Sequence, residues 1–183
     1  MISRRCFLKC AIAFACSYRL GKITGRECAF ASTGLERTTE KVLRLHNVHT
    51  GEQLHTRYCV DGDYDQNEIQ RINYLLRCHY TNTVKPISIK VIDLLCAIKD
   101  RFARGKEIRI VSGYRSAEYN EGLRRLGRHV VAGSLHLTGL AIDFALPGVR
   151  TEELSKAAIQ FQAGGVGLYP DFVHIDVGRV RHW

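Results

Sequence analysis

Three short segments combine polar side chains that could do chemistry with apolar, strand-like surroundings. They are SGYRS (112–116), SLHLTGLAID (134–143) and DFVHID (171–176). A catalytic zinc ion commonly takes three protein ligands of the histidine and carboxylate type and keeps a fourth position for water. Two histidines and one aspartate in these segments fit that description, so we take His136, Asp143 and His174 as candidate metal ligands.

The spacing and the neighbours of these three residues favour a shared cation. His136 and Asp143 are seven residues apart, with Gly139 between them as a turn. Asp143 lies between Ile142 and Phe144, so in a strand it faces away from two apolar side chains. A carboxylate buried in that way needs a cation or strong hydrogen bonds. The alternative is that each residue is an ordinary buried polar group. That alternative explains a single histidine well, but it explains the three residues together less well.

The same segments resemble a known family. SGYRS (112–116), SLHLTGLAIDF (134–144) and GGVGLYPDFVHIDVGRVRHW (164–183) are similar to the M15 zinc peptidases. That family includes D-Ala-D-Ala carboxypeptidases, dipeptidases and murein endopeptidases, and the chain resembles in particular the twin-arginine-exported murein endopeptidase branch. The resemblance covers residues 41–183.

The resemblance implies a small, single-domain α+β metallopeptidase fold with a central antiparallel sheet. It also implies that His136, Asp143 and His174 hold Zn²⁺, and that Arg115 binds the substrate or stabilises charge at the scissile carbonyl. The planar fork of an arginine suits a carboxylate or an oxyanion. A second interpretation of Arg115 is a surface residue paired with Glu118.

Hydrolysis also needs a general base, and two aspartates are candidates. Asp171 precedes His174 by three residues, where many M15 members have an acidic residue that acts as base, often a glutamate with a longer reach. Asp176 follows His174 by two residues, so in a strand it lies on the same side. Asp176 could be the base, or it could orient His174 by a hydrogen bond to the ring nitrogen that does not bind the metal. We favour Asp171.

The elements that must position these residues can be predicted from periodicity, and they give an α+β fold. Residues 41–60 alternate apolar and polar side chains around Thr50-Gly51, which predicts a hairpin. Residues 65–68 have the spacing of a helix start, and 89–102 predict a second helix closed by Gly105.

Shorter elements are expected around the chemical segments. Strands are predicted over 108–112, 140–145 and 172–177, and helices over 117–126 and 151–162, the latter capped by Thr151. The glycines at 164, 165 and 167, with Pro170, predict a turn that leads to Asp171.

The first 31 residues resemble a twin-arginine export signal. Arg4 and Arg5 precede a short apolar run, and Ala29-Phe30-Ala31 offers a small-x-small cleavage site. We therefore expect a signal at 1–31 and a zinc peptidase domain at 32–183, exported to the periplasm. The apolar run is shorter than the roughly 20 residues that a membrane span requires, so we expect no stable membrane insertion once the signal is removed.

The distribution of charge narrows the classes of partner that the protein could bind. The formal net charge is +9, but residues 1–31 hold six basic and one acidic residue and so carry five of these nine charges. The remaining +4 suits an acidic polymer as a partner and does not argue for nucleic acid.

Beyond the predicted signal only three cysteines remain. We expect them to be buried core residues, with a Cys78–Cys96 disulfide as the alternative. They are Cys59, Cys78 and Cys96.

These observations predict a zinc-dependent hydrolase that cleaves peptide bonds in peptidoglycan, most simply a murein endopeptidase. One alternative is a D,D- or L,D-carboxypeptidase that trims stem peptides. We favour the endopeptidase because residues 148–165 contain no insertion that would close one end of a groove. Another alternative is a wall-binding module that keeps the fold without catalysis.

Overall fold

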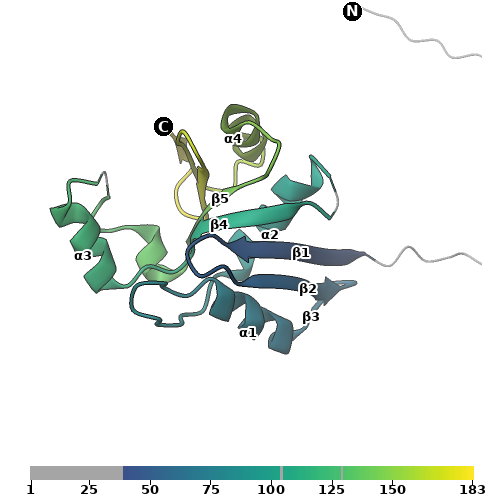
Figure 1. The fold of residues 1–183 in the computed structure, drawn as a ribbon. Helices are drawn as coiled ribbons and strands as arrows, with labels where there is room; N and C mark the ends of the chain where they lie inside the picture. The colour runs from purple at the N-terminus through teal and green to yellow at the C-terminus, as the bar shows by residue number, and fades with distance from the viewer. Residues whose placement is uncertain (1–38, 104, 129) are drawn as a thin grey trace, which may run out of the picture. The chain divides into compact units, whose positions relative to one another are not determined.

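The computed structural model describes residues 39–103, 105–128 and 130–183. The predicted export signal and its cleavage site lie outside the described residues. Within the described part, eight strands, four α-helices and one 3₁₀ helix follow one another (Figure 1). The strands are β1 (Glu40–Asn47), β2 (Gln53–Val60), β3 (Asp63–Tyr64), β4 (Glu107–Ser112), β5 (Ala141–Ala145), β6 (Gly165–Leu168), β7 (Val173–Asp176) and β8 (Arg181–His182). The helices are α1 (Gln66–Leu75), α2 (Ile89–Asp100), α3 (Ala117–Arg125), η1 (Leu135–Thr138) and α4 (Thr151–Ile159).

All eight strands belong to one sheet with the order β3-β2-β1-β4-β5-β7-β6-β8. The predicted α+β class is confirmed, and most neighbouring strands run antiparallel as expected. Two pairs, β1 with β4 and β6 with β8, are parallel, so the sheet is mixed. The β1–β4 pair is parallel because the chain returns to the same end of the sheet through α1 and α2 before it enters β4.

The predicted hairpin and the start of α1 are both present. β1 and β2 pair antiparallel on either side of the Thr50-Gly51 turn, where Gly51 has a φ of 71°. Asp65 caps α1 by accepting hydrogen bonds from the backbone amides of Asn67 and Glu68, which otherwise lack intrahelical partners. Both elements follow from local sequence signals.

The apolar core fills the space between the sheet and the helices. Helix α2 packs against β1, β7 and α4, while α1 packs against β2. The central strands contribute alternate residues, Ile142 and Phe144 from β5 and Val173 and Ile175 from β7, all fully buried. Because side chains alternate along a strand, the residues between them point to the opposite face of the sheet. That face carries Asp143, His174 and Asp176.

Some local predictions were wrong. The glycine-rich segment after α4 forms strand β6, and not only a turn, with β8 beside it. Thr151 is the first residue of α4, and the capping position is Arg150, which makes no capping hydrogen bond with its side chain. Helix α2 ends at Asp100, earlier than Gly105.

The three cysteines beyond the predicted signal are free and buried, as expected for core residues, and no disulfide joins Cys78 to Cys96. Among the described residues, no helix has both the length and the apolarity that crossing a membrane requires.

Candidate metal centre and cavity

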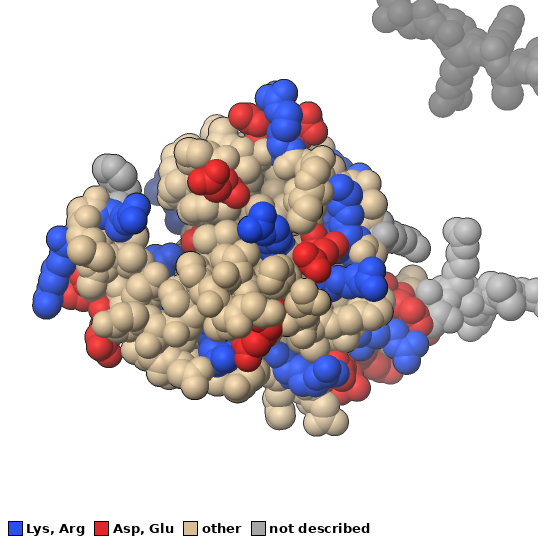
Figure 2. All heavy atoms as spheres, in the orientation of Figure 1, with Lys and Arg blue, Asp and Glu red and all other residues tan. Residues whose placement is uncertain are grey.

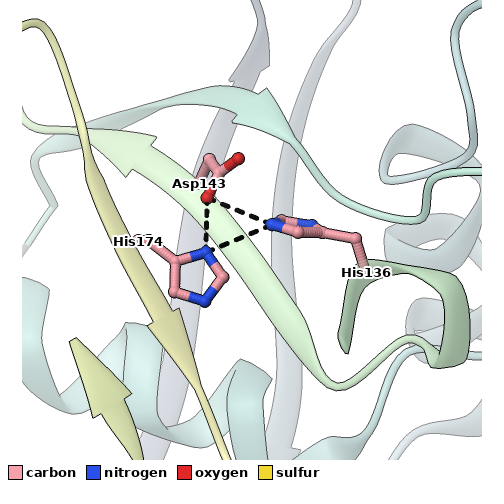
Figure 3. A group of neighbouring side chains, drawn as sticks. All are labelled: His136, Asp143 and His174. Carbon is pink, nitrogen blue, oxygen red and sulfur yellow. Dashed lines mark hydrogen bonds and ion pairs between the residues drawn. The ribbon is translucent and has the colours of Figure 1, made fainter. Parts of the chain in front are cut away.

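The three predicted ligands converge on one point (Figure 3). His136 comes from η1, Asp143 from β5 and His174 from β7, where the register places Asp143 directly opposite His174. The Nε2 atom of His136 lies 3.1 Å from Oδ1 of Asp143 and 3.2 Å from Nδ1 of His174. The third side of this triangle, from His174 Nδ1 to Asp143 Oδ1, measures 2.7 Å.

The outer nitrogen of each histidine faces a group that can only accept a hydrogen bond. His136 Nδ1 lies 2.7 Å from the carbonyl oxygen of Gly113, and His174 Nε2 lies 3.3 Å from Oδ2 of Asp176. A carbonyl or carboxylate oxygen requires a proton on the facing ring nitrogen. With a cation between the two rings, the proton of each neutral histidine would sit on the outer nitrogen, and the inner nitrogen would offer its lone pair to the cation.

These tautomers bring three electron-pair donors within 3.2 Å of one another, namely His136 Nε2, His174 Nδ1 and Asp143 Oδ1. Such an arrangement is repulsive unless a cation or a proton lies among the donors. Imidazole and carboxylate are ligand types that zinc and several other divalent metals accept. The donor set therefore fits a divalent metal ion.

The same contacts shift the pKa values of the two acids on this face. Burial alone would raise the pKa of Asp143, but the charges and hydrogen bonds of His136 and His174 outweigh it and hold the pKa below its ordinary value. Burial is likewise outweighed for Asp176, whose pKa falls to about 2 because His174, the amides of Gly165 and Gly178, and Arg181 all stabilise the carboxylate. Both acids are therefore ionised at neutral pH.

Asp176 has no free surface and no free hydrogen-bonding capacity on the side of the cavity. Its side chain is 0% exposed. Oδ1 accepts from the amides of Gly165 and Gly178 at 2.9 and 2.8 Å. Oδ2 accepts from Arg181 Nη2 at 2.8 Å and from His174 Nε2 at 3.3 Å. Asp176 therefore contacts the outer nitrogen of His174 with an oxygen that Arg181 also binds.

Arg115 is buried beside the candidate ligands. Its Nη2 lies 3.4 Å from Oδ2 of Asp143 and from the hydroxyl of Ser112, and its Nη1 lies 3.4 Å from Oδ1 of Asn120. Its Nε has no hydrogen-bond partner among the described residues. The predicted alternative, a surface pair with Glu118, does not occur among the described ion pairs, where the partner of Arg115 is Asp143.

Two close backbone contacts fix the segment that carries His136. Gly139 ends η1 with a φ of 70°, a left-handed conformation that glycine adopts without strain. A Cβ at Gly139 would also overlap the carbonyl oxygen of Pro86. On the other side, the backbone N–H of Arg115 donates to the carbonyl oxygen of His136 at 3.2 Å. These contacts hold the imidazole of His136 beside Asp143, in the middle of β5.

The triad lies at the floor of a cavity of about 570 Å³. One wall is the segment that follows α3, with Arg128, Val130 and Val131. The opposite wall is aromatic and comes from the C-terminal part of the chain. It consists of Tyr169, Phe172 and Trp183. A second cavity, of about 530 Å³, lies over β2 and α1 and contains none of the candidate ligands.

The aromatic wall is tied to the sheet. The rings of Tyr169 and Phe172 stack with centroids 4.5 Å apart, and Trp183 Nε1 donates to the hydroxyl of Tyr169 at 3.2 Å. Trp183 packs against Gly167, where an added Cβ would lie 2.7 Å from the indole. The Arg181 guanidinium lies 5.1 Å from the Trp183 ring centroid, a cation–π distance.

The structure does not bring every predicted residue to the cavity. Asp171 is exposed on the turn before β7 and does not line the cavity. Arg128 and Arg181, which no motif of the sequence singles out, do line it. The alternation Arg181-His182-Trp183 after a buried strand was the available signal for Arg181, because it puts an arginine and a tryptophan on one side of an extended segment.

Comparisons with known proteins agree on one family. A family model described as "Peptidoglycan L,D-endopeptidase MepK" matches residues 36–183. The peptidoglycan L,D-endopeptidase MepK of Escherichia coli (strain K12) is 37% identical over 157 residues, which cover 85% of each chain. The probable peptidoglycan L,D-endopeptidase MepK of Haemophilus influenzae is 34% identical over 146 residues, or 78% of each chain. No solved structure matches.

Proposed function

Because the chain belongs to the M15_2 peptidase family, described as peptidoglycan L,D-endopeptidase MepK, we propose that it is a zinc-dependent endopeptidase of peptidoglycan. The observation that carries this proposal is the convergence of His136 Nε2, His174 Nδ1 and Asp143 Oδ1 at the floor of a large cavity. Peptidoglycan is then the partner, and nucleic acid is not.

In this proposal His136, Asp143 and His174 hold the zinc ion. When bound, zinc supplies a Lewis acid for the peptide carbonyl and lowers the pKa of a water molecule, to about 7 in well-tuned sites. The carbonyl oxygen of Gly113 and the carboxylate of Asp176 keep the two histidines in the tautomers that offer lone pairs to the ion.

Arg115 is the proposed electrostatic residue. Its guanidinium lies at the cavity floor beside Asp143, and its contacts of 3.4 Å leave room for a shorter bond to a substrate oxygen. A fixed cation at this place stabilises negative charge that develops on the scissile carbonyl.

Asp171 remains the proposed general base, on the strength of its place three residues before His174. The full burial of Asp176 and its four hydrogen bonds support a positioning role for that residue instead. Asp171 is exposed, and the next residue in the chain, Phe172, lines the cavity. Asp171→Ala should then lower turnover by about 10² to 10⁴ while zinc content stays unchanged. Unchanged turnover would remove Asp171 from the mechanism.

The proposed function is tested by pairing metal analysis with digestion of cell-wall fragments. Purified chain should contain about one zinc ion, and it should convert cross-linked muropeptide dimers to monomers. Release of free amino acid from monomers would assign a carboxypeptidase instead. Zinc binding without hydrolysis of any muropeptide would leave only a wall-binding module. Asp143→Ala should lose both zinc and activity, whereas the exposed residue Asp63 gives a matched control, Asp63→Ala.

We further propose that residues 1–31 are a twin-arginine signal and that 32–183 form the exported periplasmic enzyme. The support is the pair Arg4-Arg5, the apolar run and the small-x-small site at 29–31. An Arg4→Lys, Arg5→Lys double variant should remain in the cytoplasm. Normal export of that variant would contradict this route without bearing on the catalytic proposal.

A further inference from the structure

The cavity is positively charged once its single acid is assigned to the metal. Among the described residues that line it, and apart from histidines, the side chains that carry charge at neutral pH are three arginines and one aspartate, Asp143. A divalent ion at the triad more than offsets the charge of Asp143. Figure 2 shows the hollow between the α3 segment and the C-terminal part of the fold, with Lys or Arg atoms at its edge. Such a cavity favours a substrate with negative charge.

The three arginines differ in how far they are already engaged. Arg115 is buried and contacts Asp143, and Arg181 donates to Asp176. Arg128 is exposed on the cavity wall, and its guanidinium makes no hydrogen bond or ion pair with another described residue. Arg128 is therefore the arginine with its full hydrogen-bonding capacity available for a ligand.

The backbone of Arg128 is held in place although no other described residue binds its guanidinium. Gly127 follows α3 with a φ of 69°, and the backbone N–H of Arg128 donates to the carbonyl oxygen of Leu123 at 3.0 Å. These features form a helix C-terminal cap, which fixes where the chain leaves α3. The wall beyond Arg128 is tied back to the helix, because Asn120 Nδ2 donates to the carbonyl oxygen of Val131 at 3.2 Å.

We infer that Arg128 is a specificity residue that binds a substrate carboxylate close to the scissile bond, so that the enzyme prefers stem peptides with a free carboxylate there over the corresponding carboxamides. This inference rests on the proposed function and names the substrate class of the same cavity. A guanidinium pairs with both oxygens of a carboxylate, whereas a carboxamide has no charge and presents one N–H₂ group that cannot accept. The aromatic wall opposite packs against the apolar part of the same peptide.

The test compares two cross-linked stem-peptide dimers that differ only in free carboxylates or carboxamides next to the scissile bond. Wild-type enzyme should show a kcat/KM about tenfold higher for the acid dimer, since one charge-assisted hydrogen bond gives about that factor. In Arg128→Ala the ratio of kcat/KM for the acid dimer to kcat/KM for the carboxamide dimer should fall to about one. The fall should come from a higher KM for the acid dimer, with kcat little changed. Arg125→Ala removes an exposed arginine of α3 outside the cavity and should keep the wild-type ratio. A ratio of one in wild type, or an unchanged ratio in Arg128→Ala, would overturn the inference.

A binding measurement separates this inference from the proposed function. Trp183 is the only tryptophan of the chain and lines the cavity, so its fluorescence reports dimer binding without turnover. The acid dimer should bind about tenfold more tightly than the carboxamide dimer, and Arg128→Ala should abolish this difference. If neither dimer is cleaved while the binding difference follows Arg128, the endopeptidase proposal fails and the carboxylate site stands. Equal binding of both dimers refutes the carboxylate site whatever the activity.

Discussion

Replacing Asp176 by asparagine should weaken zinc binding although Asp176 is not a proposed ligand. The amide oxygen of asparagine can keep the hydrogen bonds from the amides of Gly165 and Gly178. The N–H₂ group then takes the place of Oδ2, where it meets Arg181 Nη2 and His174 Nε2, both of which are donors. The exposed part of Arg181 can turn to water, but the ring of His174 cannot, because it is buried.

The buried ring can relieve this conflict only by moving its proton. If Nε2 of His174 loses its hydrogen to accept from the asparagine, the proton goes to Nδ1, which faces Asp143. The lone pair needed for zinc is then lost. Loss of such a supporting partner typically lowers metal affinity by about 10- to 100-fold. The lost charge-assisted hydrogen bond to His174 should also lower the free energy of unfolding of the metal-free chain by about 2 kcal/mol.

The assay is competition for zinc with a chromophoric chelator at fixed pH, beside urea unfolding of the metal-free chains. The matched control is Asp63→Asn, which changes an exposed aspartate of β3. It should have the zinc affinity and the free energy of unfolding of the wild type. Wild-type zinc affinity in Asp176→Asn would refute the positioning argument. Wild-type affinity combined with a loss of turnover at saturating zinc would assign the general-base role to Asp176.

Three further predictions follow from the site and the fold. His136→Ala should reduce bound zinc from about one ion per chain to none, measured by metal analysis, while circular dichroism shows the fold retained; a fully occupied variant would contradict the ligand assignment. Gly139→Ala should lower the free energy of unfolding in urea by at least about 2 kcal/mol, because a Cβ there is strained at positive φ and overlaps the Pro86 carbonyl oxygen. Gly133→Ala, whose Cβ would meet nothing within 4 Å, is its control, and equal stability of the two would refute this reasoning. A chain starting at Ser32 should titrate three thiols after denaturation without reductant, and a single thiol would reveal a disulfide; the three are Cys59, Cys78 and Cys96.

The sequence predicted those elements whose signals are local. The start of α1 depends on one side chain, Asp65, which accepts hydrogen bonds from the backbone amides of Asn67 and Glu68. Because these residues lie next to one another in the chain, four residues are enough to predict the start of the helix. The hairpin of β1 and β2 follows from alternation around a glycine turn. The convergence of His136, Asp143 and His174 was predicted because three polar residues in apolar segments need a common partner.

What the sequence could not predict depends on distant neighbours. Gly165 and Gly167 suggested a turn, whereas they are strand residues whose lack of a side chain makes room for Asp176 and Trp183. The place of Asp171 relative to the cavity depends on how the turn before β7 packs, and spacing from His174 carries no information about that. The role of Arg128 likewise appears only when the segment after α3 is seen facing the C-terminal aromatic residues.

The register of Asp143 opposite His174 across two hydrogen-bonded strands has a consequence for how the proposed metal ion would be acquired. Two of the proposed ligands are fixed by the same ladder that holds the centre of the sheet together, so little chain entropy would remain to be lost on binding an ion. If the proposed zinc site is right, loading would be able to follow folding, and one divalent ion would be able to replace another without unfolding of the sheet. The identity of the ion in the cell would then follow the supply of metals in the compartment as much as the preference of the protein.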